Sequence, residues 1–200
     1  MLSPLEFRRQ LVHILVGLIT VILIYFDLLS PWAIFLLIIA GLLLSFIAKR
    51  VDIPLISFFL DHLEREEQKK TFPGKGTIFF FIGVLLVLKL FDRDIALAAI
   101  MVLTLGDSIS HLFGAQFGLT RNLFNGKSRK LLEGTLMGTV TGFLGALLFV
   151  PYLEAILGSA AAMVAEVVKI DFNEHTLDDN LIVPLVAGTV MMLVRNLLGV

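Results

Sequence analysis

The chain has 200 residues, of which 58% are hydrophobic and 16% charged, and its formal net charge is −1. A soluble domain has about 45–50% apolar and about 25% charged residues, so this composition argues against a water-soluble fold and indicates a membrane protein. A chain without an overall basic charge also lacks the field that gathers nucleic acid, which excludes nucleic acid as a partner. Cysteine is absent, which excludes disulfides, thiolate metal sites and cysteine nucleophiles.

Seven apolar segments follow one another along the chain, and we expect each to form a membrane-spanning helix. A bilayer core about 30 Å thick needs about 20 apolar residues per helical span. The segments are 11–26, 32–47, 77–91, 95–117, 131–150, 155–168 and 181–198. The third and sixth are short, and the fourth is purely apolar only as far as Leu105, so some helices are expected to be short, broken or re-entrant. The predicted fold class is an all-α polytopic integral membrane protein with about seven transmembrane helices.

Lysine and arginine lie mostly on one side of this arrangement. With a cytoplasmic N-terminus, all of them except Lys89, Arg93 and Arg195 fall on the cytoplasmic side, in agreement with the positive-inside rule. Residues 51–70 pass from an apolar stretch to a dense charge cluster, which predicts a cytoplasmic amphipathic helix in the membrane interface. A solvated loop is the alternative for this segment. No repeat or linker divides the chain, so we expect a single domain over residues 1–200.

Three acidic residues interrupt apolar segments near the face that the expected topology makes cytoplasmic. Asp107 lies in the fourth segment, Glu133 opens the fifth and Glu166 lies near the end of the sixth. An ionised carboxylate near the bilayer centre costs about 2.5–3.5 kcal/mol, so each acid needs a partner or a wet cavity. His13 and the polar run 178–180 are expected at the same depth.

Helical spacing gives two of these segments a face of small residues. Asp107 and His111 are four residues apart, so they share one helix face with Gly114 and Gly118. In the next segment, positions 134, 138 and 142 are all glycine. Small residues let a neighbouring helix or a ligand approach closely, and for the glycines alone a packing seam is the simpler interpretation. Packing does not require an acid, so Asp107 indicates a site.

The loop between the fourth and fifth segments carries cations that such a site would need. Residues 121–130 read RNLFNGKSRK, with four cations and a glycine in ten residues. Cations and backbone donors can hold a polyphosphate, while facing carboxylates can hold Mg²⁺ through one or two ligands and bridging phosphates. The alternative is a loop that is basic only because it is cytoplasmic. The coincidence of cations and carboxylates at one depth favours the polyphosphate site.

Several familiar motifs are missing. GKS at 126–128 is not the end of a Walker A motif, because Arg121 stands where the first glycine of that motif should be. The chain has no GxSxG, no HExxH and no GxGxxG after a strand. The four histidines are too scattered for a zinc set, so His13 or His111 acting singly is the favoured role.

Four parts of the chain resemble the membrane polyprenol and dolichol kinases, with the phytol kinases and the CTP-dependent diacylglycerol kinase. This family is related more distantly to the phosphatidate cytidylyltransferases. The parts are EFRRQLVHILVG (6–17), EREEQKKTFPGKGT (64–77), the pair GDSISHLFGAQFG (106–118) and KLLEGTLMG (130–138), and AEVVKIDFNEHTLDDNLIVPLVAG (165–188). Together these parts extend over nearly the whole chain. The pair at 106–118 and 130–138 is the part most specific to the family.

The resemblance implies transfer of the γ-phosphate of a nucleoside triphosphate, typically CTP, to an isoprenoid or lipid alcohol, with Mg²⁺ and a cytoplasmic active site. Polyprenol or dolichol, phytol or geranylgeraniol, and diacylglycerol are the acceptor classes. Carried over by position, the expected catalytic residues are Asp107, Glu133 and His111, with Glu133 or His111 as the base. The expected metal ligands are Asp107, Glu133 and Asp178. The expected nucleotide-binding residues are Lys127, Arg129, Lys130, Gly134, Thr135, Asp178, Asp179 and Asn180.

Two other functions stay open at this point. A cytidylyltransferase would use a lipid phosphate to attack the α-phosphate of CTP, but the chain lacks the histidine-glycine-glycine and aspartate-arginine signatures of those enzymes. A transporter would also carry acids on discontinuous helices, but here the acids gather toward one face and no repeat is visible. The expected partners are the two substrates and membrane lipids, and a homo-oligomer is compatible with the same sequence.

Overall fold

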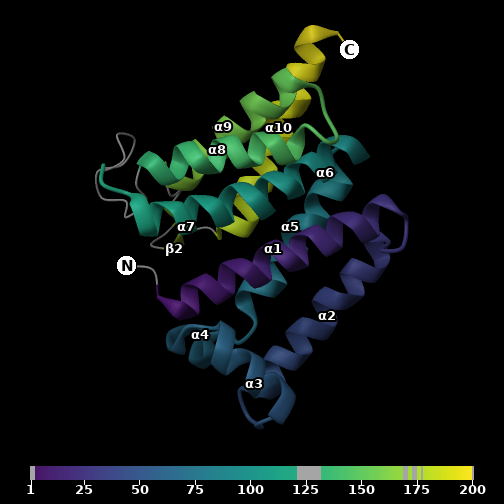
Figure 1. Cartoon of the computed structure of the whole chain (residues 1–200). Helices are drawn as coiled ribbons and strands as arrows, with labels where there is room; N and C mark the ends of the chain where they lie inside the picture. The colour runs from purple at the N-terminus through teal and green to yellow at the C-terminus, as the bar shows by residue number, and fades with distance from the viewer. Residues whose placement is uncertain (1–2, 121–131, 169–170, 173–174, 177, 200) are drawn as a thin grey trace.

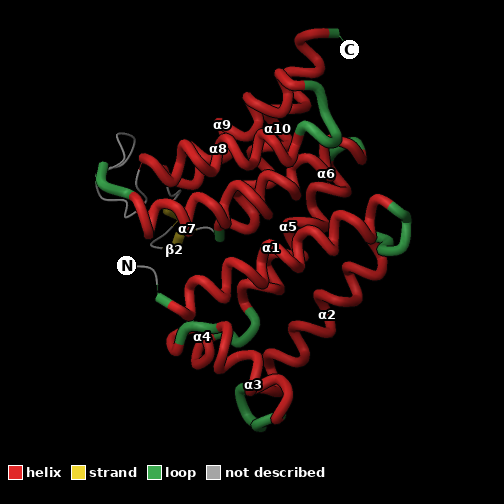
Figure 2. The backbone as a smooth tube through the Cα atoms, in the orientation of Figure 1, coloured by secondary structure: helices red, strands yellow, loops and turns green. Residues whose placement is uncertain are grey.

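The computed structural model describes residues 3–120, 132–168, 171–172, 175–176 and 178–199, and within them helices dominate (Figure 1, Figure 2). The helices are α1 (Pro4–Tyr25), α2 (Pro31–Ala48), α3 (Pro54–Leu63), α4 (Glu66–Thr71), α5 (Lys75–Leu90), α6 (Arg93–Met101), the π-helical η1 (Val102–Asp107), α7 (Ser108–Phe117), α8 (Leu132–Ala146), α9 (Tyr152–Val168) and α10 (Asp179–Leu198). Two short strands, β1 (Asp171–Phe172) and β2 (His175–Thr176), pair antiparallel between α9 and α10. The expected helical class is confirmed apart from this pair.

Each of the seven apolar segments expected from the sequence contains a helix. The fourth runs without a break over Arg93–Phe117, with the π-helical turn where the sequence ceases to be purely apolar. Among the described residues, four helices are long and apolar enough to cross a membrane: α1, α2, Arg93–Phe117 and α10. The helices α5, α8 and α9 have 16, 15 and 17 residues. The fold is therefore compatible with an integral membrane protein, and the count of about seven spans stays a prediction.

Serine and proline determine where the first two helices begin. The Ser3 hydroxyl accepts a hydrogen bond from the Glu6 amide, and the Ser30 hydroxyl accepts one from the Ala33 amide, both at 3.2 Å. A proline follows each serine at the start of the helix, where no backbone N–H is needed. The two helices then run in opposite directions through a short connection (Figure 1).

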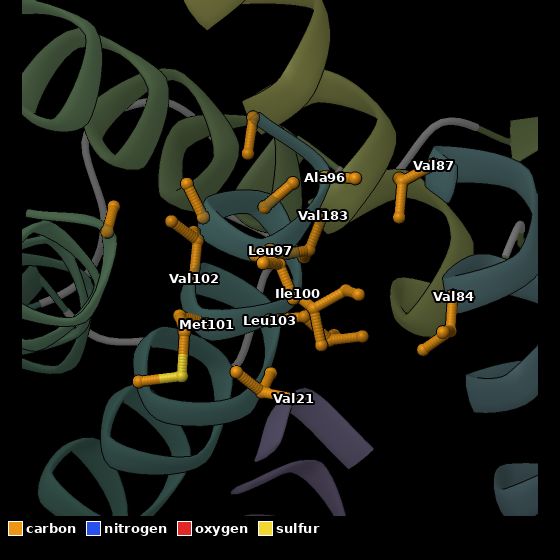
Figure 3. Close-up of a cluster of buried hydrophobic side chains, with 14 of the residues drawn as sticks. Val21, Val84, Val87, Ala96, Leu97, Ile100, Met101, Val102, Leu103 and Val183 are labelled. Carbon is orange, nitrogen blue, oxygen red and sulfur yellow. The ribbon is translucent and has the colours of Figure 1, made fainter. Parts of the chain in front are cut away.

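The helix over Arg93–Phe117 lies at the centre of the bundle. In its most apolar stretch 78% of the residues are buried, against 17% in α2. Figure 3 shows Leu97, Ile100 and Leu103 of this helix packed between Val21 of α1 and Val183 of α10. A helix that is apolar all round belongs in a core, whereas the exposed apolar side chains of α2 are suited to lipid. The central helix therefore fixes the position of Asp107 relative to its neighbours.

The segment predicted as an interfacial helix forms α3 and the short α4. The side chains of Leu55, Phe58 and Phe59 on α3 are all more than half exposed. Lys69 of α4 donates a hydrogen bond to Glu66 and another, at 2.9 Å, to Asp61 of α3, and these two bonds raise the pKa of its ammonium group. An exposed apolar side beside a charged segment fits a helix that lies in the membrane surface. The helix itself is confirmed, and its interfacial position stays a prediction.

Arg195 joins three helices at the end of the bundle where α10 finishes. Its guanidinium lies 2.6 Å from the Asp94 carboxylate at the start of α6 and 2.8 Å from the Glu154 carboxylate at the start of α9. Glu154 is only 1% exposed, so its charge depends on this pairing and not on water. The planar fork of arginine can bond two carboxylates at once, which lysine cannot reproduce.

The glycines of α8 form a packing seam with the central helix. A Cβ atom on Gly138 would lie 2.7 Å from the Gly106 carbonyl oxygen and 2.8 Å from the Met163 sulfur atom. A Cβ atom on Gly134 would lie 2.5 Å from the Ser110 carbonyl oxygen. Backbones can approach this closely only where no side chain separates them. The packing interpretation of the 134, 138 and 142 stripe is therefore confirmed.

Replacing Gly138 with Ala is expected to destabilise the bundle, although alanine is the better helix former. The added methyl group meets a backbone carbonyl that cannot turn away, and overpacking of this kind costs about 1–3 kcal/mol. Gly76→Ala is the matched control, since nothing lies within 4 Å of a Cβ atom there and alanine favours helix by about 1 kcal/mol. Thermal unfolding in detergent should show a lower midpoint for the first variant only. An unchanged midpoint for Gly138→Ala would mean that the seam is looser than described.

Candidate functional site

Four side chains from different helices converge in one group, called the acid–histidine cluster below. Its members are Asp107 at the end of η1, His111 on α7, Glu166 in the last turn of α9 and Asp179 at the start of α10. One ligand atom from each lies within 4.8 Å of those of the others. The His111 Nε2 atom is 3.5 Å from the Asp107 carboxylate and 3.8 Å from the Glu166 carboxylate. The cluster could therefore hold a metal ion.

Local structure explains why Asp107 and His111 meet the other two residues. They are one helical turn apart on the same face. Asp107 closes the π-helical turn, whose extra residue re-aims the side chains that follow it, and such turns are frequent at functional sites. The helices α9 and α10 enclose that face, α9 near its end and α10 near its beginning. The cluster therefore marks the end of the bundle where α1, α5 and α10 begin, called the site end below (Figure 1).

The cluster is sheltered but still accessible. The Glu166 side chain is fully buried and the Asp107 side chain is 10% exposed, whereas that of His111 is 31% exposed. Asp179 is partly exposed. His111 and Asp179 are therefore the members that a ligand arriving from outside the bundle could touch first.

The donor set fits a small divalent cation. Mg²⁺ binds oxygen ligands at about 2.0–2.1 Å, so donor atoms on opposite sides of it are about 4.2 Å apart. The spread of up to 4.8 Å in the cluster needs only a small adjustment of side chains. Three carboxylates suit Mg²⁺ or Mn²⁺, and an imidazole is a better ligand for Mn²⁺ or Zn²⁺ than for Mg²⁺.

The neighbouring residues Asp178 and Asp179 have different positions. Asp178 caps α10, with its carboxylate accepting hydrogen bonds from the Asn180 amide and side chain, and it forms an ion pair with Lys75 of α5 at 3.3 Å. Asp179 turns into the cluster. The Asn180 side chain also donates to the Gly76 carbonyl oxygen. Asp178 and Asn180 therefore join α10 to α5. Asp178 was the expected metal ligand, but among the described residues Asp179 takes that place in the cluster.

Glu133 is the second expected metal ligand that the described residues do not bring into the cluster. Its carboxylate accepts hydrogen bonds from the Thr120 amide at 3.0 and 3.3 Å, so it holds the chain just beyond α7. Gly134 and Thr135, expected to bind nucleotide, are both buried on α8, and Gly134 packs against α7. A Cβ atom on Gly134 would meet Ser110 and Gly114 of α7, so this glycine belongs to the packing seam, and the nucleotide-binding role of both residues stays a prediction. The expected phosphate cations Lys127, Arg129 and Lys130 lie outside the described residues.

Glu166 is the member of the cluster to which the resemblance gave no role. Its sequence signal was an acid near the end of an apolar segment, which is costly without a partner or a wet cavity. That signal shows that the residue needs a local environment, but it cannot tell which helix provides it. Only the packing of α9 against the central helix brings Glu166 to His111.

Three of the segments that carry the resemblance meet around the N-terminus of α1. The Glu6 carboxylate is 3.0 Å from both Arg9 on the same helix and Arg65 at the start of α4. The Glu64 carboxylate accepts a hydrogen bond from the Gly74 amide at 2.7 Å, while burial raises its pKa. Through Lys75 and its ion pair with Asp178, the same region reaches α10. The site end therefore combines segments that lie far apart in the sequence.

Two apolar cavities lined by described residues do not open onto the cluster. One of about 290 Å³ lies between Phe7 of α1 and one side of α7, where Ile109, Leu112 and Gln116 line it. Those three residues lie on the side of α7 opposite Asp107 and His111. The other, of about 210 Å³, is formed by α2, α3 and the start of α5.

Comparison with known proteins shows a similarity along most of the chain. An uncharacterized protein of Methanocaldococcus jannaschii is 28% identical over 190 residues, which cover 93% of this chain and 92% of the relative. No family model matches the chain. No solved structure matches it either. The similarity extends over almost the whole of both chains, and the description of the relative names no activity.

Proposed function

We propose that this protein is a membrane phosphotransferase that moves the γ-phosphate of a nucleoside triphosphate, most simply CTP, to an isoprenoid or other lipid alcohol. The acid–histidine cluster is the observation that carries the proposal. It joins three carboxylates and an imidazole at the site end of an apolar bundle. A lipid hydroxyl and a charged triphosphate can meet only where an apolar environment borders an aqueous one. A polar cluster at the end of an apolar helix bundle would lie at such a border.

Charge stabilisation is the main task in phosphoryl transfer. Asp107, Glu166 and Asp179 would hold Mg²⁺, which when bound neutralises charge on the transferring phosphoryl group. The described cluster has ligand atoms close enough for this. The nucleotide phosphates would be held by Lys127, Arg129 and Lys130 of the segment 121–130, as the resemblance implies.

His111 is the favoured base. Its Nε2 atom points to the carboxylates of the cluster, and about a third of the side chain is exposed. As the acceptor oxygen attacks the γ-phosphorus atom, the bond to the β-phosphate oxygen breaks, CDP leaves and the hydroxyl proton passes to His111. Glu133 is a weaker candidate, because its carboxylate is bonded to the Thr120 amide and is not in the cluster.

A cytoplasmic position of the site belongs to the same proposal. Arg8, Arg9, Arg65 and Lys75 lie on the segments that form the site end. The opposite end has short connections and few cations. Under the positive-inside rule, the site end faces the cytoplasm.

Transfer of label from CTP is the direct test. Purified protein in detergent would be given Mg²⁺, CTP labelled at the γ-phosphate, and a panel of polyprenol, geranylgeraniol, phytol and diacylglycerol. We expect label in one of the lipids and none after the divalent cation is removed with EDTA. A second assay with CTP labelled at the α-phosphate would include a lipid phosphate as acceptor.

The other outcomes contradict the proposal. Label that moves from the α-phosphate to a lipid phosphate, with release of pyrophosphate, would mean cytidylyl transfer. Movement of divalent cations into liposomes without nucleotide would mean transport. A protein that binds Mn²⁺ at the cluster but labels no alcohol with any nucleoside triphosphate is not this kinase.

A further inference from the structure

His13 on α1 has a buried nitrogen atom that finds no hydrogen-bond partner within the described residues. Its Nε2 atom is shielded from solvent. The ring is held by an edge contact with Phe80 of α5, with centroids 5.2 Å apart. Buried polar atoms are nearly always hydrogen-bonded in folded proteins, and the exceptions occur where a ligand or water completes the structure. His13 therefore points to a partner that is not part of the described chain.

The position of His13 is fixed beside the acid–histidine cluster by a close helix contact. Gly17 of α1 packs against the side chain of Thr104 so closely that no Cβ atom would fit. The helix α1 and the central helix run in opposite directions (Figure 1). His13 is one turn before Gly17 on α1, and Asp107 is about one turn after Thr104 on the central helix. Because the helices are antiparallel, both steps lead toward the site end, so His13 lies opposite Asp107. Asp107, Asp178 and Arg9 are the charged groups that act on His13, and the His111 ring is also within reach of it.

The same helix contact holds two further polar atoms without a partner. The hydroxyl oxygens of Thr104 and Ser108 are buried, and the described residues provide no hydrogen bond for either. Both residues are on the central helix, and Ser108 follows Asp107 directly. The Thr104 hydroxyl group is enclosed by the contact with Gly17, whereas Ser108 is one turn further toward the site end, as His13 is on α1. A hydroxyl group can donate one hydrogen bond and accept two, which suits an imidazole nitrogen and a serine hydroxyl.

The outer face of α1 indicates where this hydroxyl comes from. Leu11, Val12 and Leu15, which surround His13 in the sequence, are 47%, 37% and 58% exposed. Gln10 and Gly17 on the inner face are buried. His13 is two residues from both Leu11 and Leu15, so it lies on the inner side of α1, and the exposed apolar surface is on the other side of the same helix. The outer face of α1 thus suits contact with a lipid tail, whose polar head would pass beside α1 to reach His13.

We propose that His13 binds the hydroxyl group of the acceptor lipid and holds it toward the cluster. This role rests on the proposed function. A neutral imidazole can donate a hydrogen bond to a hydroxyl group or accept one from it. The acid–histidine cluster on the neighbouring helices is suited instead to a cation and the phosphates bound to it. His13 is then a substrate-binding residue, distinct from the base His111. Ser108 can complete the hydrogen bonds of the same hydroxyl.

The kinetic test compares three variants of the protein. His13→Phe keeps the ring but removes the hydrogen bond, and we expect its KM for the lipid alcohol to rise about tenfold with its KM for CTP unchanged. His13→Gln keeps a donor and an acceptor and should stay within about threefold of the wild type. His62→Gln, on α3 and exposed, is the matched control. A loss of kcat at unchanged KM for the alcohol in both His13 variants would overturn the proposal.

A binding test separates this inference from the proposed function. Protein with ¹⁵N-labelled histidine in nanodiscs would be titrated with geranylgeraniol and then with diacylglycerol, without nucleotide or divalent cation. The His13 signal, assigned by its loss in His13→Gln, should shift while that of His62 stays. If neither alcohol shifts it, His13 does not hold the hydroxyl, even if the protein is a kinase. If the signal shifts but no alcohol is ever labelled, the kinase proposal fails and the binding role of His13 stands.

Discussion

Replacing Asp107 with Asn is expected to abolish phosphoryl transfer while the protein stays folded in the membrane. Asp107 is the member of the acid–histidine cluster that lies 3.5 Å from His111 and within ligand distance of Glu166 and Asp179. Asparagine has the same shape but no charge, so it weakens the binding of a cation without changing the packing of η1. Loss of groups that only orient metal ligands already costs about 10–100-fold, so we expect at least a hundredfold loss of activity here.

The adjacent residues Asp178 and Asp179 give this prediction a matched pair. Asp179→Asn should lose Mn²⁺ binding and transfer activity as Asp107→Asn does, because Asp179 is in the cluster. Asp178→Asn should keep metal binding, because Asp178 caps α10 and pairs with Lys75. Asparagine is also a good helix cap, so only the ion pair is weakened.

Two measurements decide the outcome for these variants. Binding of Mn²⁺ by electron paramagnetic resonance and transfer of label from CTP would be measured on each purified protein, with thermal unfolding as a check of folding. Equal metal binding by Asp107→Asn and wild type would remove Asp107 from the site. Loss of metal binding in Asp178→Asn but not in Asp179→Asn would reverse the assignment of the pair.

Replacing Arg195 with Ala is expected to destabilise the bundle strongly from the end opposite the cluster. The substitution leaves the carboxylate of Glu154, only 1% exposed, without its guanidinium partner at 2.8 Å. Removing one partner of a buried ion pair costs about 3–5 kcal/mol, because the other charge remains buried. The midpoint of thermal unfolding should therefore fall by more than that of any other variant described above.

A second substitution separates the ion pair from loss of packing. Glu154→Leu in the Arg195→Met background removes both buried charges, and apolar replacement of a buried pair is often neutral or stabilising. The double variant should therefore be more stable than Arg195→Ala. The folded fraction of each variant should still bind Mn²⁺, because Arg195 and the cluster are at opposite ends of the bundle. A double variant as unstable as Arg195→Ala would mean that packing, and not the charge on Glu154, explains the loss.

Apolar length and spacing were enough to predict where most helices lie. All seven apolar segments contain helices, and the π-helical turn occurs where the fourth ceases to be purely apolar, just before Asp107. The helix predicted within residues 51–70 is also present as α3. These predictions succeed because a chain in an apolar environment must satisfy its backbone hydrogen bonds within each segment, so the local sequence determines the helix.

The composition of the site could be predicted only in part. Asp107 and His111 were expected as a pair because residues four apart in a helix are neighbours, and they do share a face. Glu133 and Asp178 were expected as metal ligands from their positions in the resembling segments. In the described structure the Glu133 carboxylate accepts a hydrogen bond from the Thr120 amide, and Asp178 is the N-cap of α10.

The sequence by itself determined the helices, their apolar faces and the need of each buried acid for a partner. Only the tertiary structure decided which acids become partners, because this depends on how the helices are packed and rotated. The glycine seam of α8, the contact of Gly17 with Thr104 and the Arg195 ion pairs fix those rotations. Asp178 is the N-cap of α10, with an extended backbone, whereas Asp179 is the first residue of the helix, so neighbouring identical residues acquire different roles.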